Sequence, residues 1–186
     1  DNIDLKAAET HEVTVVNCPV ATTVSVAELT LGLMLSLIRH IPKANAGMKA
    51  GEWLKKELAG TELYGKALGI IGFGNIGEAV GRRALAFDMQ VLATDPVRKP
   101  DEIKAAGAEP VDLDDLLARS DIITLHIPHI KATHYLLDAE AFKQMKDGVR
   151  IICAARGGVI EESALLAALE SGKVAAAALD VYEKEP

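Results

Sequence analysis

Short apolar runs alternate with amphipathic segments through most of the chain. The apolar runs are Leu68–Gly72, Val91–Thr94, Ile122–Leu125, Val149–Cys153 and Ala175–Val181. The segment after the first run repeats apolar residues at helical spacing, at Ile76, Val80, Ala84 and Phe87. Short runs of this kind predict strands that are buried on both faces. Strands that alternate with helices predict parallel pairing in a Rossmann-like, doubly wound α/β sheet.

Two residues mark the ends of predicted helices. Asp112 is suited to an N-cap and predicts a helix over Leu113–Arg119, with Asp115 in its first turn. Gly172 predicts the end of a helix around Ser163–Ser171, because a glycine there can adopt the left-handed conformation that closes a helix.

The first 65 residues follow another pattern. Val13–Val16 predicts one short strand. Ser25 and Glu28 have the spacing of a capping box, and they predict the start of a long helix that reaches Leu37 or beyond. This helix is apolar nearly all round, so it has to be covered on more than one side, either within its own domain or by a second subunit.

Charge and composition narrow the class of protein. The net charge of −7 argues against nucleic acid as a partner, because phosphate binding requires a basic face. The most apolar stretch, Leu29–Ile38, is shorter than the ~20 residues that span a bilayer, and the acidic start has no signal peptide. Cys18 and Cys153 form neither a CxxC pair nor a metal-ligand spacing. We therefore expect a soluble cytoplasmic protein with no metal, no membrane and no nucleic-acid partner.

A glycine motif follows the first buried run. Residues 72–77 read Gly-Phe-Gly-Asn-Ile-Gly, a GxGxxG that opens the helical pattern from Ile76. In this context Gly72 permits a tight turn, Gly74 lets the backbone approach a pyrophosphate, and Gly77 lets strand and helix pack closely. The N–H groups at the start of the helix bind the anion. The motif predicts a dinucleotide site.

An acidic residue follows at the end of the next strand. Asp95, 18 residues after Gly77, has the position of the carboxylate that binds the hydroxyls of the adenosine ribose and repels a 2′-phosphate. Arg98 and Lys99 lie close by, so NADP is disfavoured and not ruled out. We predict NAD as the cofactor, residues 66–186 as the dinucleotide-binding core, and residues 1–65 as an N-terminal strand and apolar interface helix of the same domain.

Further motifs give the chain a family resemblance. They are Asp1-Asn2-Ile3-Asp4, Ser25-Val26-Ala27-Glu28, Glu62-Leu63-Tyr64-Gly65-Lys66, Arg156-Gly157-Gly158 and Asp180-Val181-Tyr182-Glu183-Lys184-Glu185-Pro186. In this order, and together with the glycine loop, they resemble the D-isomer-specific 2-hydroxyacid dehydrogenases over the whole chain. The resemblance implies a two-domain enzyme whose NAD-binding domain is inserted within its substrate domain, and this chain resembles the inserted segment.

The resemblance also implies roles for single residues. Arg156 is the catalytic arginine, whose planar guanidinium suits the carboxylate and carbonyl of a substrate. Glu185 is the acid that hydrogen-bonds the catalytic histidine and raises the pKa of that histidine. The positions that line NAD in similar enzymes are Asn75, Ile76, Ile127, Ala154, Ala155, Arg156 and, at the nicotinamide end, Asp180.

Two parts of the family's active site are expected outside these residues. The catalytic histidine belongs a short way beyond Pro186, and the loop that grips the substrate carboxylate belongs before Asp1. None of the five histidines present takes the catalytic place, so we expect this segment to bind NAD without turnover. The departures from the family pattern are Thr22, Asn75, His129-Ile130 and Cys153. Of these, Cys153 puts a hydrogen bond between strand-end loops in doubt, and Asn75 removes a positive charge near the pyrophosphate.

The implied reaction is reversible hydride transfer between a D-2-hydroxy acid and NAD. Overall likeness to the family favours 3-phosphoglycerate as the substrate, which is oxidised to 3-phosphohydroxypyruvate in serine synthesis. No residue in this segment is identified as one that binds the substrate's phosphate group. A glyoxylate, hydroxypyruvate or D-lactate reductase is the alternative within the family. A corepressor-like NAD-sensing module is the alternative of another class, and Arg156 with Glu185 favours the enzyme. The resemblance further implies a homodimer formed through the helix Val26–Ile38.

Overall fold

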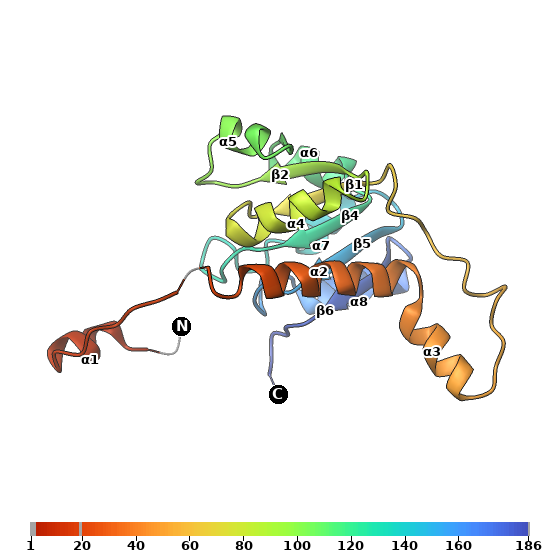
Figure 1. The fold of residues 1–186 in the computed structure, drawn as a ribbon, viewed down its shortest axis with the longest axis horizontal. Coiled ribbons are helices and arrows are strands. Elements are labelled where there is room, and N and C mark those ends of the chain that lie inside the picture. Colours follow the sequence, from red (N-terminus) through yellow and green to blue (C-terminus); the bar gives the residue numbers. More distant parts are fainter. Residues whose placement is uncertain (1–2, 19, 186) are drawn as a thin grey trace.

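A six-stranded parallel sheet forms the centre of the protein (Figure 1). The computed structural model describes residues 3–18 and 20–185, so Asp1, Asn2, Pro19 and Pro186 lie outside the described residues. The strands are β1 (Ala67–Ile71), β2 (Gln90–Thr94), β3 (Glu109–Pro110), β4 (Ile122–Leu125), β5 (Val149–Cys153) and β6 (Val174–Leu179). Their order in the sheet is β3-β2-β1-β4-β5-β6. This order changes direction between β1 and β4, as in the Rossmann fold, and confirms the predicted doubly wound α/β sheet.

Helices cover both faces of this sheet. Within the described residues they are α1 (Leu5–Thr10), α2 (Thr23–Ile38), α3 (Ile41–Lys49), α4 (Asn75–Leu85), α5 (Pro100–Ala105), α6 (Leu113–Arg119), α7 (Ala139–Gln144) and α8 (Glu162–Glu170). Helices α2, α4 and α5 contribute to the core on one face, and α6, α7 and α8 to the core on the other. Helices α1 and α3 extend away from the sheet at opposite ends of the molecule (Figure 1).

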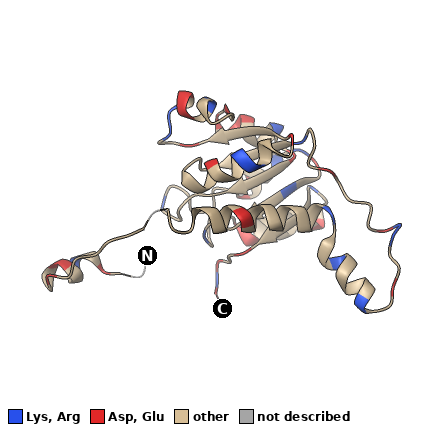
Figure 2. Cartoon of the chain, viewed as in Figure 1, with Lys and Arg blue, Asp and Glu red and all other residues tan. Residues whose placement is uncertain are grey.

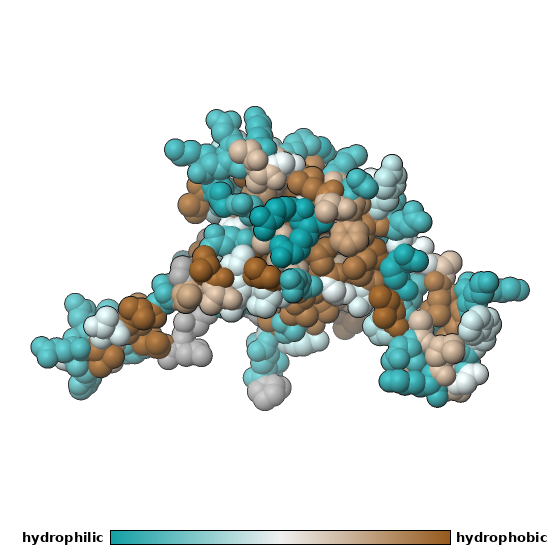
Figure 3. Space-filling model, in the orientation of Figure 1, coloured by the Kyte–Doolittle hydropathy of each residue, from teal (hydrophilic) through white to brown (hydrophobic). Residues whose placement is uncertain are grey.

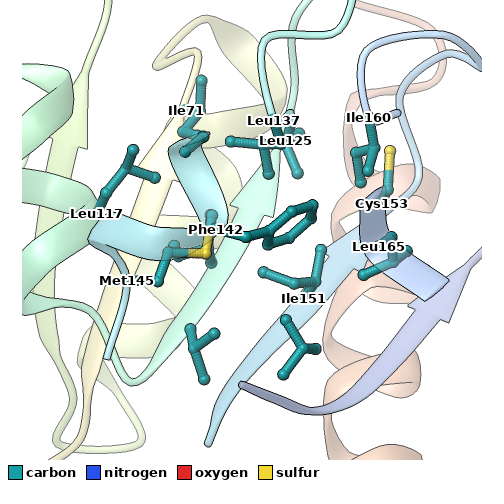
Figure 4. Close-up of a cluster of buried hydrophobic side chains, with 14 of the residues drawn as sticks. Ile71, Leu117, Leu125, Leu137, Phe142, Met145, Ile151, Cys153, Ile160 and Leu165 are labelled. Carbon is teal, nitrogen blue, oxygen red and sulfur yellow. The ribbon is translucent and has the colours of Figure 1, made fainter. Parts of the chain in front are cut away.

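Apolar side chains of β1, β4, β5 and β6 divide between the two cores. In β1, Leu68 and Ile70 pack with α2 and α4, whereas Ile71 packs with α6 and α7. In the core on the face covered by α6, α7 and α8, the ring of Phe142 lies between Leu125 and Ile151 (Figure 4). Burial on both faces explains why these strands appear in the sequence as continuous apolar runs.

The predicted strands and helix ends are mostly confirmed. The five strands predicted from residue 68 onward are present, with ends shifted by at most two residues. The side chain of Asp112 caps α6 by accepting a hydrogen bond from the N–H of Asp115 at 2.8 Å. Gly172 follows α8 with a φ of +78°, as a closing glycine should. The short edge strand β3 is additional to the prediction.

Two predictions for the N-terminal part are wrong. Val13–Val16 forms no strand: its residues are exposed and lie in no sheet ladder, and a strand requires a partner for its N–H and C=O groups. Ser25 is not an N-cap, because α2 begins at Thr23 with Thr22 before it. The hydroxyl of Ser25 donates to the carbonyl of Thr22 at 3.0 Å instead. Ser25 therefore lies inside the first turn, where such back-bonding to a local carbonyl is available.

We next consider helices that could span a membrane and side chains that could hold a metal ion. Among the described residues no single helix is long and apolar enough to cross a membrane; α2 and α3 pass such a test only together, with a bend of 63° between them. Helix α2 buries Ala27, Met34 and Ile38 against the sheet, which accounts for its apolar character. Within residues 3–18 and 20–185, no three His, Cys, Asp or Glu side chains are placed to hold a metal ion.

Candidate active site

The glycine loop joins β1 to α4 with close packing at two of its three glycines. Gly72 has a φ of +90°, and a Cβ there would lie 2.6 Å from the carbonyl oxygen of His126. A Cβ on Gly77 would lie 2.1 Å from the carbonyl oxygen of Gly72. A side chain at either position would therefore push apart the first turn of α4 and the strand ends beside it.

Gly74, in contrast, faces open space. It is the N-cap of α4, and a Cβ at this position would meet nothing within 4 Å. The first N–H groups of a helix have no carbonyl partner within it, so they are available to an anion at this end of α4. An open approach at Gly74 together with a helix N-terminus fits the pyrophosphate of a dinucleotide. The loop geometry therefore agrees with the role predicted for the motif.

Asp95 binds the two loops that flank this opening. Its carboxylate accepts hydrogen bonds from the N–H of Phe73 at 2.7 Å, of Val97 at 2.8 Å and of Arg98 at 2.9 Å. A carboxylate has about four acceptor positions, so capacity remains for a ribose hydroxyl. The ribose contact stays a prediction. The structure adds a second contribution, because Asp95 ties the glycine loop to the loop after β2.

A cleft runs along the carboxyl ends of the central strands, next to the glycine loop. Six of the predicted site residues line it: Ile76, Ile127, Ala154, Ala155, Arg156 and Glu185. The other six lie outside its lining. Gly72, Asp95 and Asp180 directly follow β1, β2 and β6 on the same edge of the sheet, and Gly74, Asn75 and Gly77 belong to the glycine loop and the first turn of α4. Ligands of open α/β sheets bind at this edge, where the strand order changes direction.

Arg156 and Glu185 come from two segments that are packed tightly together. A Cβ on Gly157 would lie 1.8 Å from the carbonyl oxygen of Tyr182, so only glycine fits between the loop after β5 and the C-terminal segment. The guanidinium of Arg156 donates to the carbonyl of Ala155 at 2.7 Å. One carboxylate oxygen of Glu185 accepts from the N–H of Tyr182 at 2.8 Å. This packing holds a basic and an acidic side chain at one cleft, which suits binding of a carboxylate and transfer of a proton.

Glu183 fixes the same C-terminal segment from its other side. Its carboxylate accepts from the N–H of Glu162 at 2.8 Å and from the hydroxyl of Tyr135 at 3.2 Å. The position of Glu185 therefore depends on α8 and on the loop after β4, and not only on its own turn.

His126 lies in the cleft with one nitrogen unsatisfied. Its Nε2 is 3.1 Å from the hydroxyl of Thr124, and its buried Nδ1 has no hydrogen-bond partner among the described residues. Burial lowers the pKa of His126 to about 4, because the charged imidazolium is poorly solvated there. The buried Nδ1 of this neutral imidazole is a donor or an acceptor according to the tautomer, and either role leaves a polar atom beside the cleft without a partner among the described residues.

Some cleft residues were missed by sequence reasoning. They are Thr22, Val26, His129, Ile130, Tyr182 and Glu183. Thr22 and Val26 bring the start of α2 to the cleft, whereas the sequence pattern assigns this helix only to burial or to an interface. Nothing in their spacing indicates a ligand, because an apolar helix position has the same signature in a core and in a cleft. His129 and His134, which contact each other at 3.0 Å, likewise carry no sequence signal of their proximity to the site.

Comparisons with known proteins agree with this geometry. A family model described as "D-isomer specific 2-hydroxyacid dehydrogenase, NAD binding domain" matches residues 31–186. A D-3-phosphoglycerate dehydrogenase of Archaeoglobus fulgidus is 48% identical over 186 residues, and a hydroxypyruvate reductase of Thermotoga maritima is 50% identical over 186 residues. Both alignments cover 100% of this chain, but only 35% of the first relative and 60% of the second. The chain thus spans only part of the length of these relatives.

A solved structure shows the same fold. A glyoxylate reductase from Paecilomyes thermophila superposes with a TM-score of 0.91 at 40% sequence identity, covering 100% of this chain and 56% of that protein. The fold of this chain thus occurs in a protein that is similar to it in sequence.

Proposed function

This chain belongs to the D-isomer-specific 2-hydroxyacid dehydrogenases as their NAD-binding domain, and from this membership we propose that the protein containing it transfers a hydride between NAD and a D-2-hydroxy acid. The observation that carries the proposal is the shared cleft, because Arg156 and Glu185 line the same cleft as Ile76 of the glycine-loop helix. The NAD that these residues would hold would supply the hydride acceptor for C2 of the hydroxy acid.

The residues of this chain bind and orient the reactants. Arg156 donates to the substrate carboxylate and to the oxygen on C2, and its fixed planar fork favours that bidentate geometry over a point charge. The hydroxyl proton passes to a histidine of the protein outside these residues, and Glu185 stabilises the protonated form of that histidine. The N–H groups at the start of α4 hold the pyrophosphate, and Asp95 holds the adenosine ribose.

We propose 3-phosphoglycerate as the substrate, which places the reaction in serine synthesis. Several relatives named D-3-phosphoglycerate dehydrogenase, at 44% to 48% identity over the whole chain, support this choice. Hydroxypyruvate and glyoxylate, from the names of the other two relatives above, are the competing substrates.

Steady-state kinetics test this proposal. The protein that contains this chain is assayed by NADH absorbance with 3-phosphoglycerate, D-glycerate, glycolate and D-lactate. We expect the highest kcat/KM for 3-phosphoglycerate. The substitution Arg156→Lys should lower kcat/KM more than it lowers NAD affinity, because it keeps the charge but loses the fork. Binding of NAD without turnover on any of the four acids would contradict the enzyme and leave a binding module.

A second copy of the chain is the partner we propose for α2. Helix α2 exposes Val24 and Leu29, and α3 exposes Ile41 and Met48. Apolar side chains are also exposed along α2 and around α1 and α3 (Figure 3), and α2 carries few charges (Figure 2). An apolar surface of this extent favours association.

We predict that the protein sediments as a dimer at micromolar concentration. The double substitution Val24→Asp and Leu29→Asp should shift it to a monomer, because buried unpaired carboxylates are costly at an apolar interface. The control is Leu166→Asp on α8, a leucine that is more exposed than Leu29 and lies on the opposite face of the sheet, which should leave the dimer intact. A dimer that survives the double substitution would place the interface elsewhere.

A further inference from the structure

An ion pair joins α4 to the loop after β2, beside the opening at Gly74. Glu78 follows Gly77 in the first turn of α4, and its carboxylate is hydrogen-bonded to the guanidinium of Arg98. Arg98 lies three residues after Asp95, and its backbone N–H donates to the Asp95 carboxylate at 2.9 Å. The pair therefore lies next to the carboxylate that the proposed function assigns to the adenosine ribose.

An arginine in this loop has chemical consequences for the choice of dinucleotide. NAD and NADP differ by the phosphate on the 2′-oxygen of that ribose, and an arginine near the end of β2 is the group that accommodates this phosphate in NADP-binding folds. A guanidinium binds phosphate strongly through two parallel hydrogen bonds. Taken alone, Arg98 would favour NADP, in opposition to Asp95.

The contact with Glu78 changes that expectation. The guanidinium already donates to a carboxylate, and the Arg98 side chain is only 29% exposed. A phosphate would have to displace the Glu78 carboxylate and would also meet its negative charge. We infer that Glu78 is a specificity-determining residue, which holds Arg98 toward α4 and away from the ribose and so makes the domain select NAD over NADP. This inference rests on the proposed function, because it assumes that the dinucleotide lies with its ribose at Asp95.

A purely structural role for the pair makes a different prediction. If the ion pair only ties α4 to the loop after β2, breaking it should weaken NAD and NADP binding to the same degree. If Glu78 restrains Arg98, breaking the pair should change the ratio of the two affinities. The ratio is therefore the readout, and it does not depend on turnover.

Calorimetric titration of the chain with NAD and with NADP measures this ratio. We expect Glu78→Gln to shift the preference toward NADP by about tenfold, since one charge-assisted contact to the 2′-phosphate becomes available. The double variant Glu78→Gln with Arg98→Gln should return to the wild-type preference. Asp101→Asn is the matched control, because it removes the same charge from an exposed acid at the start of α5 and should leave the ratio unchanged.

The outcomes separate the inference from the proposed function. NAD binding that persists with an unchanged ratio in Glu78→Gln overturns the inference alone, and so does a shift that remains in the double variant. Wild-type protein that binds neither dinucleotide contradicts the proposed function. Thermal unfolding of Glu78→Gln identifies a variant that has lost its fold; in that case Glu78→Asp, which shortens the side chain and weakens the contact, should shift the ratio in the same direction.

Discussion

Gly74→Ala is expected to weaken NAD binding about 100-fold while the chain unfolds at the wild-type temperature or slightly above it. A Cβ at Gly74 meets no atom of the protein, so the folded state carries no steric cost. Because the φ of Gly74 is −75°, alanine is free of strain there, and the change can stabilise the chain by up to about 1 kcal/mol. The same Cβ occupies the approach to the pyrophosphate, where the loss of about two charge-assisted hydrogen bonds accounts for the weaker binding.

Gly77→Ala is the comparison that distinguishes an effect on NAD binding alone from an effect on folding. Its Cβ would lie 2.1 Å from the carbonyl oxygen of Gly72, a backbone atom that cannot rotate away. We expect a loss of about 2–3 kcal/mol of unfolding free energy, in addition to weaker NAD binding. Urea unfolding and calorimetry of both variants separate the two effects. Gly32→Ala, in the open on α2, is the control: it should leave NAD binding unchanged and raise the unfolding free energy by up to about 1 kcal/mol, because alanine is the better helix former. A Gly74→Ala variant that binds NAD like the wild type would place the dinucleotide away from this loop.

The parts of the fold that sequence predicts well are those with local causes. The GxGxxG motif and the five apolar runs are short, contiguous signals. The structure has the five runs in one sheet and the motif between β1 and α4. The strand predicted at Val13–Val16 fails because β-branched residues favour extended backbone but cannot supply a neighbouring strand. The short strand β3 is missed because its second residue, Pro110, is a residue that indicates a turn or an edge.

The candidate site likewise has residues that the sequence predicts and contacts that only the folded chain forms. Strand ends predict which edge of the sheet carries Asp95, Ile127 and Arg156, because the carboxyl ends of parallel strands share one edge. The ion pair of Glu78 and Arg98 joins residues 20 positions apart, and only the return of the chain after β2 brings them together. The same holds for Asp95, whose bond to Phe73 gives it a structural contribution beside the predicted ribose contact.

His126 is expected to make the protein lose stability as the pH falls from about 6.5 to about 4. In the folded state burial lowers the pKa of His126 to about 4, whereas an unfolded histidine titrates near its ordinary value of about 6.5. Below pH ~6.5 the histidine is protonated in the unfolded chain but stays neutral in the folded chain. Unfolding therefore becomes more favourable as the pH falls, until His126 is protonated in the folded state as well. A difference of about 2.5 pH units corresponds to about 3 kcal/mol at the acid end of this window.

The substitution His126→Gln isolates this contribution. Glutamine keeps a polar group that can reach the Thr124 hydroxyl, which is 3.1 Å from Nε2 of the native ring, but it does not titrate. We expect the wild type to lose about 3 kcal/mol more unfolding free energy than His126→Gln between pH 7.5 and pH 4, as measured by urea unfolding at a series of pH values. The control is His11→Gln, since His11 is an exposed histidine outside the cleft, and its variant should follow the wild-type curve. Because the contribution belongs to the neutral ring in the folded state, stability above pH 7 should differ between wild type and His126→Gln by a constant amount. Parallel curves over the whole range would mean that His126 is protonated in the fold as readily as in the unfolded chain, and that the cleft does not exclude its charge.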